Sequence, residues 1–263
     1  MKDDLGDRIK DQYENRTRYY LPRRTYTIIR LDGKAFHTYT RNLKKPFDED
    51  LSDDIDAAVR SILPEIQGSV FAYAQSDEIS ILLTDFATPQ TCAWFDGNIQ
   101  KMTSVAASMM TAQFNRNRLL RQFNNYVRDA DSIDWNNQAF FDARVFTIPD
   151  RVEVMNYFIH RNQDCSRNSV SMVAQHHFSH KELHGKNTPE MHEMLHSKGV
   201  NWATDYSDGD KNGRLIVKEK IGVEGPKADG LIPITWRTEW VSNGAWNFTE
   251  NKDKLLEMIP KYE

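Results

Sequence analysis

The sequence predicts an α+β fold, with an antiparallel sheet and helices packed on one of its faces. Strand-like and helix-like segments alternate in the first 150 residues, in the order strand, helix, hairpin, helix, strand. Residues 151–263 are mostly helical and end with a weaker pair of strand-like segments. Of the 263 residues, 39% are hydrophobic and 11% are aromatic, which is enough apolar material for one sizeable core.

Local sequence features place each element. Residues 25–31 are rich in β-branched and aromatic side chains, which is typical of a strand, and they run directly into Asp32 and Gly33. Apolar residues at helical spacing follow Ser52, the expected N-cap, and Pro64 ends that helix. In order, we expect helix 3–20, strand 25–31, helix 52–63, strands 69–74 and 79–83, helix 94–118, strand 139–148, helices 152–162, 165–180 and 189–196, and strands 214–219 and 231–236.

These elements fit a ferredoxin-like βαββαβ sheet with the strand order 4-1-3-2. In such a sheet, the C-terminal end of the first strand lies beside the tip of the central hairpin. Asp32 and Asp77 should therefore meet, although they are far apart in the sequence. We expect residues 1–150 to form the core that carries this pair, and residues 151–263 to pack on it in a single compact unit.

Two converging carboxylates suit a pair of Mg²⁺ ions, because Mg²⁺ prefers oxygen ligands, keeps several waters and takes other ligands from substrate phosphates. Gly33 lacks a Cβ, so its carbonyl can approach a metal or a phosphate closely. Lys34 and His37 follow on the loop expected beneath a nucleotide. Asp-Gly or Ser-Asp-Glu alone is a common turn sequence, so the interpretation depends on the two segments being neighbours.

Composition narrows the functional classes. Cys92 and Cys165 are far apart, which argues against a disulfide framework or a cysteine zinc site. No segment approaches the roughly 20 apolar residues of a membrane span, so we expect a cytoplasmic protein without a membrane partner. The formal net charge of −4 disfavours nonspecific nucleic-acid binding. Two arginine clusters could still form basic patches for docking or be solvated surface charge, namely Arg16, Arg18, Arg23 and Arg24, and Arg116, Arg118, Arg121 and Arg128. Within the first cluster, Arg23 and Arg24 could contact phosphate or form surface salt bridges.

Three segments resemble the tRNA-histidine guanylyltransferase family. They read Arg-Leu-Asp-Gly-Lys-Ala-Phe-His at 30–37, Lys-Pro at 45–46 and Ala-Tyr-Ala-Gln-Ser-Asp-Glu at 72–78. The resemblance is specific over residues 25–115 and looser around Asp164-Cys165 and Lys211-Asn212. It implies a polymerase-palm-like catalytic core within residues 1–150, and an enzyme that adds nucleotides to the 5′ end of tRNA in the 3′→5′ direction.

The resemblance also implies roles for individual residues. Asp32, Asp77 and the Gly33 carbonyl would hold two Mg²⁺ ions, and Glu78 would support this catalytic pair. Lys45 and Ser76 would contact a triphosphate, and His37 would lie against the incoming nucleotide. The residues expected to bind the nucleotide are Gly33, Lys34, Ala35, Phe36, His37, Lys45 and Ser76.

ATP, GTP and other nucleoside triphosphates are the substrates that the resemblance implies. In the family, ATP activates a 5′-monophosphorylated tRNA, or an existing 5′-triphosphate is used. The 3′-hydroxyl of the incoming nucleotide then attacks that end, and AMP or pyrophosphate leaves. Members commonly form tetramers, so we expect a homotetramer.

One segment departs from the eukaryotic pattern. Members that add a single guanosine to histidine tRNA carry a His-Ile-Asn-Asn-like stretch after an Asp-Cys pair. Here Asp164-Cys165 is followed by Ser-Arg-Asn-Ser at 166–169, in which only Asn168 matches. The chain thus resembles the bacterial, archaeal and phage members, which extend 5′-truncated tRNAs by base-pair templating. We expect 5′-end repair rather than dedicated guanosine addition.

Two further features have competing interpretations. Seven histidines lie between residues 160 and 196, and those at i, i+4 spacing could hold Zn²⁺ or Ni²⁺. No cysteine or His-Glu-x-x-His pattern supports a metal there, so we expect a polar helix surface. Lys211-Asn212 could lie near a phosphate, as the resemblance suggests, or form a plain turn between Gly209 and Gly213.

Two other functions stay open at this point. A palm-type nucleotide cyclase would also place two metals at a strand end and a hairpin, but Ser76-Asp77-Glu78 replaces the Gly-Gly-Asp/Glu-Glu-Phe hairpin of diguanylate cyclases. A non-catalytic RNA-binding module would leave Asp32, Asp77 and Glu78 as exposed acids beside RNA. That arrangement is electrostatically unfavourable unless cations bind there.

Overall fold

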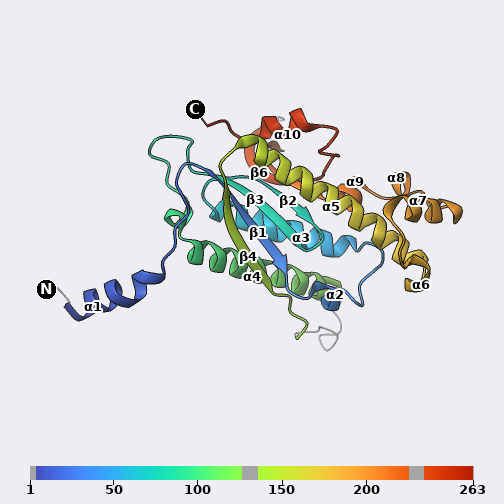
Figure 1. Ribbon diagram of the computed structural model, residues 1–263, viewed down its shortest axis with the longest axis horizontal. Coiled ribbons are helices and arrows are strands. Elements are labelled where there is room, and N and C mark those ends of the chain that lie inside the picture. Colours follow the sequence, from blue (N-terminus) through green and yellow to red (C-terminus); the bar gives the residue numbers. More distant parts are fainter. Residues whose placement is uncertain (1–3, 126–135, 225–233, 263) are drawn as a thin grey trace, which may run out of the picture.

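Figure 1 shows a computed structural model of the protein, which describes residues 4–125, 136–224 and 234–262. At its centre is an antiparallel sheet of six strands in the order β4-β1-β3-β2-β5-β6. The strands are β1 (Tyr26–Gly33), β2 (Ser69–Gln75), β3 (Glu78–Thr84), β4 (Phe141–Ile148), β5 (Arg214–Glu224) and β6 (Ile234–Gly244). The predicted order 4-1-3-2 is confirmed, and β5 and β6 continue the sheet beyond β2.

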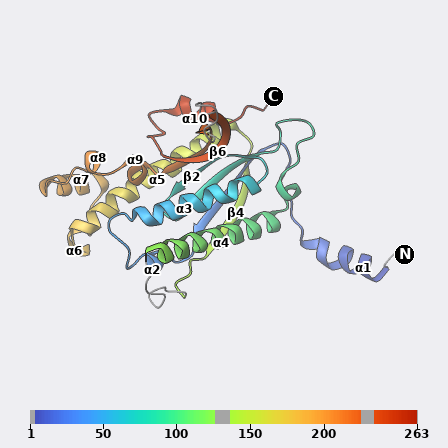
Figure 2. The same cartoon turned by 180° about the vertical axis from the view of Figure 1, so that it is seen from behind.

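Helices cover both faces of the sheet. α3 (Glu49–Ile62) and α4 (Ile99–Asn125) lie on the face seen in Figure 2, and α5 (Arg151–His177) crosses the face seen in Figure 1. The helices of the first 150 residues thus pack on one face, as predicted, while the second half covers the other. No helix in the described ranges is long and apolar enough to cross a membrane. The shorter helices are α1 (Asp4–Ile9), α2 (Phe36–Tyr39), α6 (His180–Leu183), α7 (Thr188–Ser197), α8 (Trp202–Asp205), α9 (Asp208–Asn212) and α10 (Lys252–Met258).

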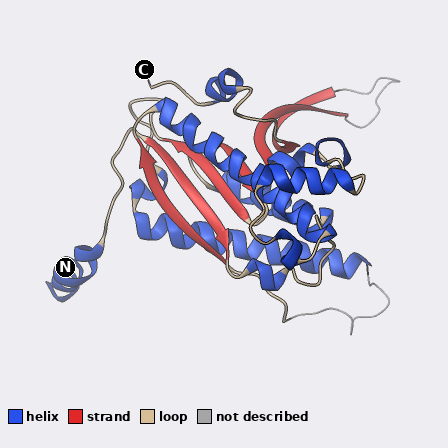
Figure 3. Ribbon diagram, turned by 45° about the vertical axis from the view of Figure 1, so that its right-hand side comes forward, coloured by secondary structure: helices blue, strands red, loops and turns tan. Residues whose placement is uncertain are grey.

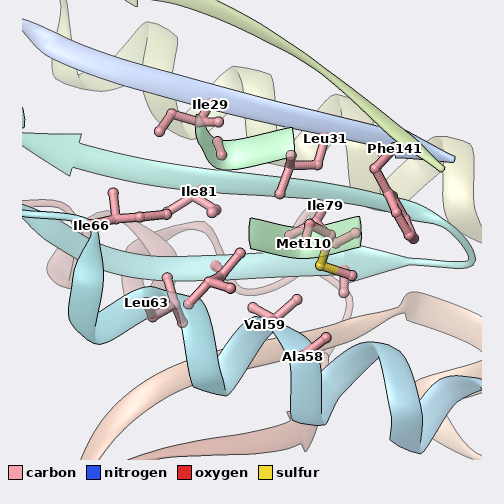
Figure 4. Close-up of a cluster of buried hydrophobic side chains, with 14 of the residues drawn as sticks. Ile29, Leu31, Ala58, Val59, Leu63, Ile66, Ile79, Ile81, Met110 and Phe141 are labelled. Carbon is pink, nitrogen blue, oxygen red and sulfur yellow. The ribbon is translucent and has the colours of Figure 1, made fainter. Parts of the chain in front are cut away.

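The core beneath α3 and α4 follows from two periodicities. Residues recurring at helical spacing turn one face of α3 toward the sheet, where Ile55, Ala58, Val59 and Ile62 are buried. Alternate residues of β1 and β3 point to that same face. Figure 4 shows the resulting contacts among Ile29, Leu31, Ile79 and Ile81 from the strands and side chains of α3 and α4.

The intervening strand residues face α5. Along β1, Tyr26 and Ile28 pack toward Phe158 of α5, whereas Arg30 and Asp32 follow at the same alternation. The other strands repeat this division, so polar side chains gather at one end of the α5 face. They are Arg30, Asp32, Gln75, Glu78, Ser80, Asp142 and Arg144.

Several element boundaries differ from those expected. α3 begins at Glu49, because the side chain of Asp48 accepts a hydrogen bond from the backbone N–H of Leu51, so Asp48 and not Ser52 is the N-cap. Residues 152–162 and 165–180 belong mainly to one continuous helix, α5. β6 begins at Ile234, and the expected strand residues 231–233 lie outside the described residues.

The N-terminal helix is shorter than expected, and the helix expected at 94–118 begins and ends later in the sequence, at Ile99–Asn125. Instead of one helix over residues 3–20, α1 is followed by short helical turns at Lys10–Glu14 and Asn15–Thr17, none of which contains a buried residue. The helix expected from residue 94 begins at Ile99. Phe95 and Asp96, in the preceding turn, have positive φ angles of 49° and 54°, which do not continue an α-helix.

Three arginines of the two clusters form ion pairs within the fold. Arg118 and Arg121 of α4 form ion pairs with Asp54 of α3, whose side chain is only 4% exposed. Arg23 forms an ion pair with Asp85 and donates to the carbonyl of Thr91. Arg16, Arg18 and Arg116 are exposed, and Arg128 lies outside the described residues. The salt-bridge interpretation therefore holds for Arg23, whereas the ion pairs of Arg118 and Arg121 were not expected.

The buried ion pairs between α3 and α4 predict a stability difference between two neighbouring acids. Asp54→Ala should lower the free energy of unfolding by about 3 kcal/mol, because it leaves the largely buried guanidinium of Arg118 without its carboxylate, while Arg121 keeps its ion pair with Asp50. Asp53→Ala is the matched control, since the Asp53 side chain is 72% exposed. Chemical denaturation monitored by circular dichroism measures both. Equal effects of the two substitutions would contradict a role for buried charge pairing.

Candidate active site

A cavity of about 590 Å³ opens at the polar end of the sheet. The end of β1, the β2–β3 turn, α5 and the loop after α2 all contribute to its walls. Nine of the ten residues expected at the site line it, namely Asp32, Gly33, Ala35, Phe36, His37, Lys45, Ser76, Asp77 and Glu78. Lys34 does not: its side chain is exposed, and its backbone N–H donates to the carbonyl of Phe140 at 2.8 Å.

Strand pairing brings the two aspartates together. β1 and β3 pair with Leu31 opposite Ile79, so Asp32 lies beside the turn that precedes β3. That turn consists of Ser76 and Asp77 alone, because Gln75 and Glu78 already pair across the hairpin. Ser76 has a φ of 48°, which lets a two-residue turn reverse the chain. Asp77 therefore projects at the tip, next to the end of β1.

Gly33 lies between the Phe36 ring and the Asp77 carboxylate, where there is no room for a side chain. A Cβ at Gly33 would come within 2.2 Å of Cδ2 of Phe36 and within 2.7 Å of Oδ2 of Asp77. Both distances are shorter than any ordinary van der Waals contact, so only glycine fits between the Phe36 ring and the Asp77 carboxylate. The backbone at Gly33 can thus lie against the acids.

The surroundings of Asp32 and Asp77 disfavour the charged form of both side chains. Burial raises the pKa of Asp77 to about 6, and the nearby charges of Asp32 and Glu78 add to the rise. Burial also raises the pKa of Asp32, with a further contribution from Glu78, while Arg30 and Arg144 oppose it. Asp32, Asp77 and Glu78 thus form a local concentration of carboxylates in which burial and neighbouring negative charge raise the pKa of both aspartates, and a bound cation would relieve this.

Glu78 is held differently from the two aspartates. Its carboxylate forms ion pairs with Arg30 of β1 and Arg161 of α5, and it accepts a hydrogen bond from the side-chain amide of Gln75 at 2.6 Å. Arg161 also bonds to Asp164 at 2.9 Å and is only 8% exposed. With both oxygens engaged, Glu78 fastens the hairpin to β1 and α5 directly beside Asp77.

Arg144 adds the nearest exposed positive charge. Its Nη2 lies 3.6 Å from Oδ2 of Asp32, and its side chain is 61% exposed. Arg144 belongs to β4, where it follows Asp142, the residue paired with Asp32 across the two strands. A solvent-exposed guanidinium, that of Arg144, therefore lies beside Asp32.

The second half of the chain supplies cavity residues that were not among the expected site residues. α5 contributes Cys165, Asn168, Met172 and Gln175, and Gly209, Asp210 and Arg214 also line the cavity. Arg30 belongs to the segment that carries the family resemblance and precedes Asp32 by two residues. Its sequence position could therefore have indicated that Arg30 lies near the site. No local pattern marks the α5 residues, because their approach to the sheet depends on how the second half packs.

The other chemical candidates have structural roles. Within the described part of the chain, no group of three or more histidine, cysteine, aspartate or glutamate side chains is arranged to hold a metal. The metal interpretation of the histidines therefore has no support, and six of the seven between 160 and 196 belong to helix surfaces or helix ends. The carbonyl of Asn212 accepts hydrogen bonds from Tyr73 and Asn162, and Lys211 donates to Ala203, which supports the plain structural interpretation of this pair.

Comparisons with known proteins agree with this geometry. The family model for tRNAHis guanylyltransferase matches residues 6–149, which include both aspartates and the loop between Gly33 and Lys45. A tRNA(His) guanylyltransferase of Schizosaccharomyces pombe is 28% identical over 243 residues, which cover 88% of this chain and 87% of that protein.

Two solved structures are similar over almost the whole chain. A bacterial tRNA(His) guanylyltransferase-like protein in complex with ATP has a TM-score of 0.81 and 37% identity, covering 98% of this chain and 99% of the other. A bacterial guanylyltransferase-like protein in complex with GTP has a TM-score of 0.76 and 35% identity with the same coverage. Together with the family model, which spans more than half of the sequence, these similarities show that the chain belongs to the tRNAHis guanylyltransferase family.

Proposed function

We propose that this protein adds nucleotides to the 5′ end of tRNA in the 3′→5′ direction, with a paired base as template. The chain is a member of a nucleotidyltransferase family. The observation that carries the proposal is the meeting of Asp32, Gly33 and Asp77 at one end of a cavity large enough for a nucleotide. Similarity to bacterial proteins in complex with ATP and GTP supports nucleoside triphosphates as substrates.

The residues present fit two Mg²⁺ ions. Asp32 and Asp77 offer oxygen ligands in an environment that destabilises both anions, and the absence of a Cβ at Gly33 leaves its backbone close to Asp77. Two protein carboxylates suffice, because Mg²⁺ takes its remaining ligands from water and substrate phosphates. When bound, the ions would lower the pKa of an attacking hydroxyl and stabilise the leaving oxygen.

The protein's own side chains would bind and orient the substrates. Lys45, which is exposed at the cavity, and Ser76 would contact the triphosphate, and His37 would lie against the incoming nucleotide. Glu78, bound by Arg30 and Arg161, would keep the hairpin tip in place. Two of the remaining loop residues, Ala35 and Phe36, would shape the wall of the cavity beside the nucleotide. Lys34 does not line the cavity, and we propose that it contacts the nucleotide from the adjacent surface.

Templated 5′-end repair is the form of the activity that we propose. The incoming nucleotide's 3′-hydroxyl would attack a 5′ end activated with ATP or carrying a triphosphate, and AMP or pyrophosphate would leave. Asn168 of the Ser-Arg-Asn-Ser segment lines the cavity.

We propose that residues 1–150 form the catalytic core, and that residues 151–263 complete it as part of one unit. We also propose that the protein acts as a homotetramer, which sedimentation analysis tests.

The direct test is extension of a tRNA lacking one 5′ nucleotide, with each of the four nucleoside triphosphates in turn. We expect addition only of the nucleotide complementary to the opposite base, and no addition after Mg²⁺ is removed with EDTA. Addition of guanosine alone, whatever base stands opposite, would contradict templated repair. A cyclic product formed from ATP or GTP without RNA would indicate a nucleotide cyclase instead.

Asp77→Asn removes the charge while keeping the shape of the side chain. Nucleotide addition should fall about a hundredfold or more, because charge stabilisation by bound metal contributes several kcal/mol to such reactions. Binding of tRNA should be nearly unchanged. Asp53→Ala, an exposed acid on α3, is the control for surface charge. Full activity of the Asp77 variant would remove this residue from the mechanism.

Gly33→Ala tests the close approach of the backbone to the acids. The added methyl group must displace either the Phe36 ring or the Asp77 carboxylate. Where the rate depends on the exact positions of the reacting groups, a displacement of about 1 Å can reduce it about a hundredfold. We expect reduced nucleotide addition and a higher Mg²⁺ concentration for half-maximal activity. An unchanged Mg²⁺ dependence would show that this backbone does not contribute to the metal site.

A further inference from the structure

β5 and β6 form a two-stranded ribbon that continues beyond the sheet. β2 pairs with β5 only from Arg214 to Ile216, whereas β5 and β6 stay paired through Gly222 opposite Trp236 and beyond. Figure 3 shows the two strands extending past the helices that cover the sheet. Trp240, opposite Lys218, still packs against the core beneath α3 and α4, whereas most residues further along the ribbon, at 219–222 and 236–239, are exposed.

The two faces of the ribbon differ in chemistry. Directly opposed residues share a face, and faces alternate along each strand. One face carries Lys218 opposite Trp240, Lys220 opposite Thr238, and Gly222 opposite Trp236. The other face carries Glu219 opposite Glu239 and Ile221 opposite Arg237. Two lysines and two tryptophans thus share one face, here called the aromatic–basic face, and Glu219 and Glu239 lie on its reverse.

Local contacts fix both rings on this face. A Cβ at Gly222 would lie 3.6 Å from ring atoms of Trp236, so the indole lies against the glycine backbone, and the residue is still 68% exposed. The ammonium group of Lys218 lies 4.9 Å from the centre of the Trp240 ring. Trp236 is therefore a large aromatic surface that is held in place and open to solvent, at little further cost in ordering.

We propose that the aromatic–basic face, formed by Lys218, Lys220, Trp236 and Trp240, binds unpaired nucleotides of the RNA substrate. An aromatic ring stacks with any base, and neighbouring ammonium groups attract the phosphates, which is how proteins bind single-stranded RNA without reading its sequence. The face has the charge that RNA requires, although the whole chain carries a net charge of −4. This inference rests on the proposed function for the identity of the RNA as tRNA.

The position of the ribbon suits a long substrate. Arg214, at the start of β5, lines the catalytic cavity, and Gly222 lies eight residues further along the strand. At about 3.4 Å per residue, Trp236 is up to about 27 Å from the cavity wall. A single nucleotide cannot span that distance, but an RNA whose 5′ end occupies the cavity can reach the ribbon.

A second copy of the chain is a poorer match for this face. In a two-fold symmetric interface the same patch meets itself. Lys218 and Lys220 would then face the identical lysines of the other copy, and like charges across an interface are unfavourable. A polyanion with exposed bases satisfies both the lysines and the rings.

Trp236→Leu and Trp236→Phe separate stacking from apolar packing. Leucine keeps apolar bulk over Gly222 but removes the ring, so the dissociation constant for tRNA should rise at least about fivefold, as expected for loss of one stacked base. Phenylalanine keeps a ring and should retain most of the affinity. Fluorescence anisotropy with labelled tRNA at fixed salt measures both, and unfolding midpoints check that each variant is folded.

Lys220→Ala and Arg237→Ala form a matched pair, because each removes one exposed cation from opposite faces of the ribbon. Lys220→Ala should weaken tRNA binding and reduce the slope of log affinity against log salt by about 1. Arg237→Ala should leave both nearly unchanged. ATP binding should be the same in all four variants, because the ribbon lies away from the nucleotide.

Three outcomes would overturn the inference: an unchanged tRNA affinity in Trp236→Leu, equal effects of the two cation substitutions, or loss of self-association with unchanged RNA affinity. The last would identify a second copy as the occupant. Failure of the wild-type protein to extend truncated tRNA would instead count against the proposed function alone, because these binding measurements do not depend on catalysis.

Discussion

The antiparallel register between β1 and β3 is the constraint on which the site depends. Leu31 opposite Ile79 places Asp32 beside the two-residue turn that contains Asp77. Because side chains alternate between faces, a shift of one residue would turn all of β3 over. Glu78 would then point toward the apolar layer of α3, and the isoleucines of β3 toward α5. Burial of apolar side chains on both faces therefore fixes the position of the acids.

α5 joins the second half of the chain to this constraint. Arg161 binds Glu78, and the hydroxyl of Tyr157 lies 2.8 Å from that of Ser80, so the helix contacts β3 at two successive residues of its polar face. A buried arginine is costly unless its charge is compensated, and here Glu78 and Asp164 compensate it. The family model ends at residue 149, yet the hairpin that carries Asp77 is held from beyond that point.

Sequence reasoning predicted the parts of the molecule that depend on local pattern. Alternation and helical spacing identified the strands and helices of the first half, and the order of elements predicted that Asp32 and Asp77 would meet. The pattern could not show that α5 is continuous, because polar residues at 163 and 164 interrupt its apolar spacing while Asp164 in fact pairs with Arg161 and Arg167. It also could not place Asn168 or Arg214 at the cavity, since neither position follows from local periodicity.

Charge placement within the fold explains how a chain with a net charge of −4 can accept a polyanion. Two arginines of the second cluster, Arg118 and Arg121, are paired with buried Asp54. The positive charges that remain exposed include Lys45 at the cavity and Arg144 beside Asp32. Phosphate attraction falls off within about 8–10 Å at physiological salt, so these local groups affect docking more than the distant surface acids. Net charge is therefore a poor guide to substrate here, because it averages over local groups that differ in sign and in exposure.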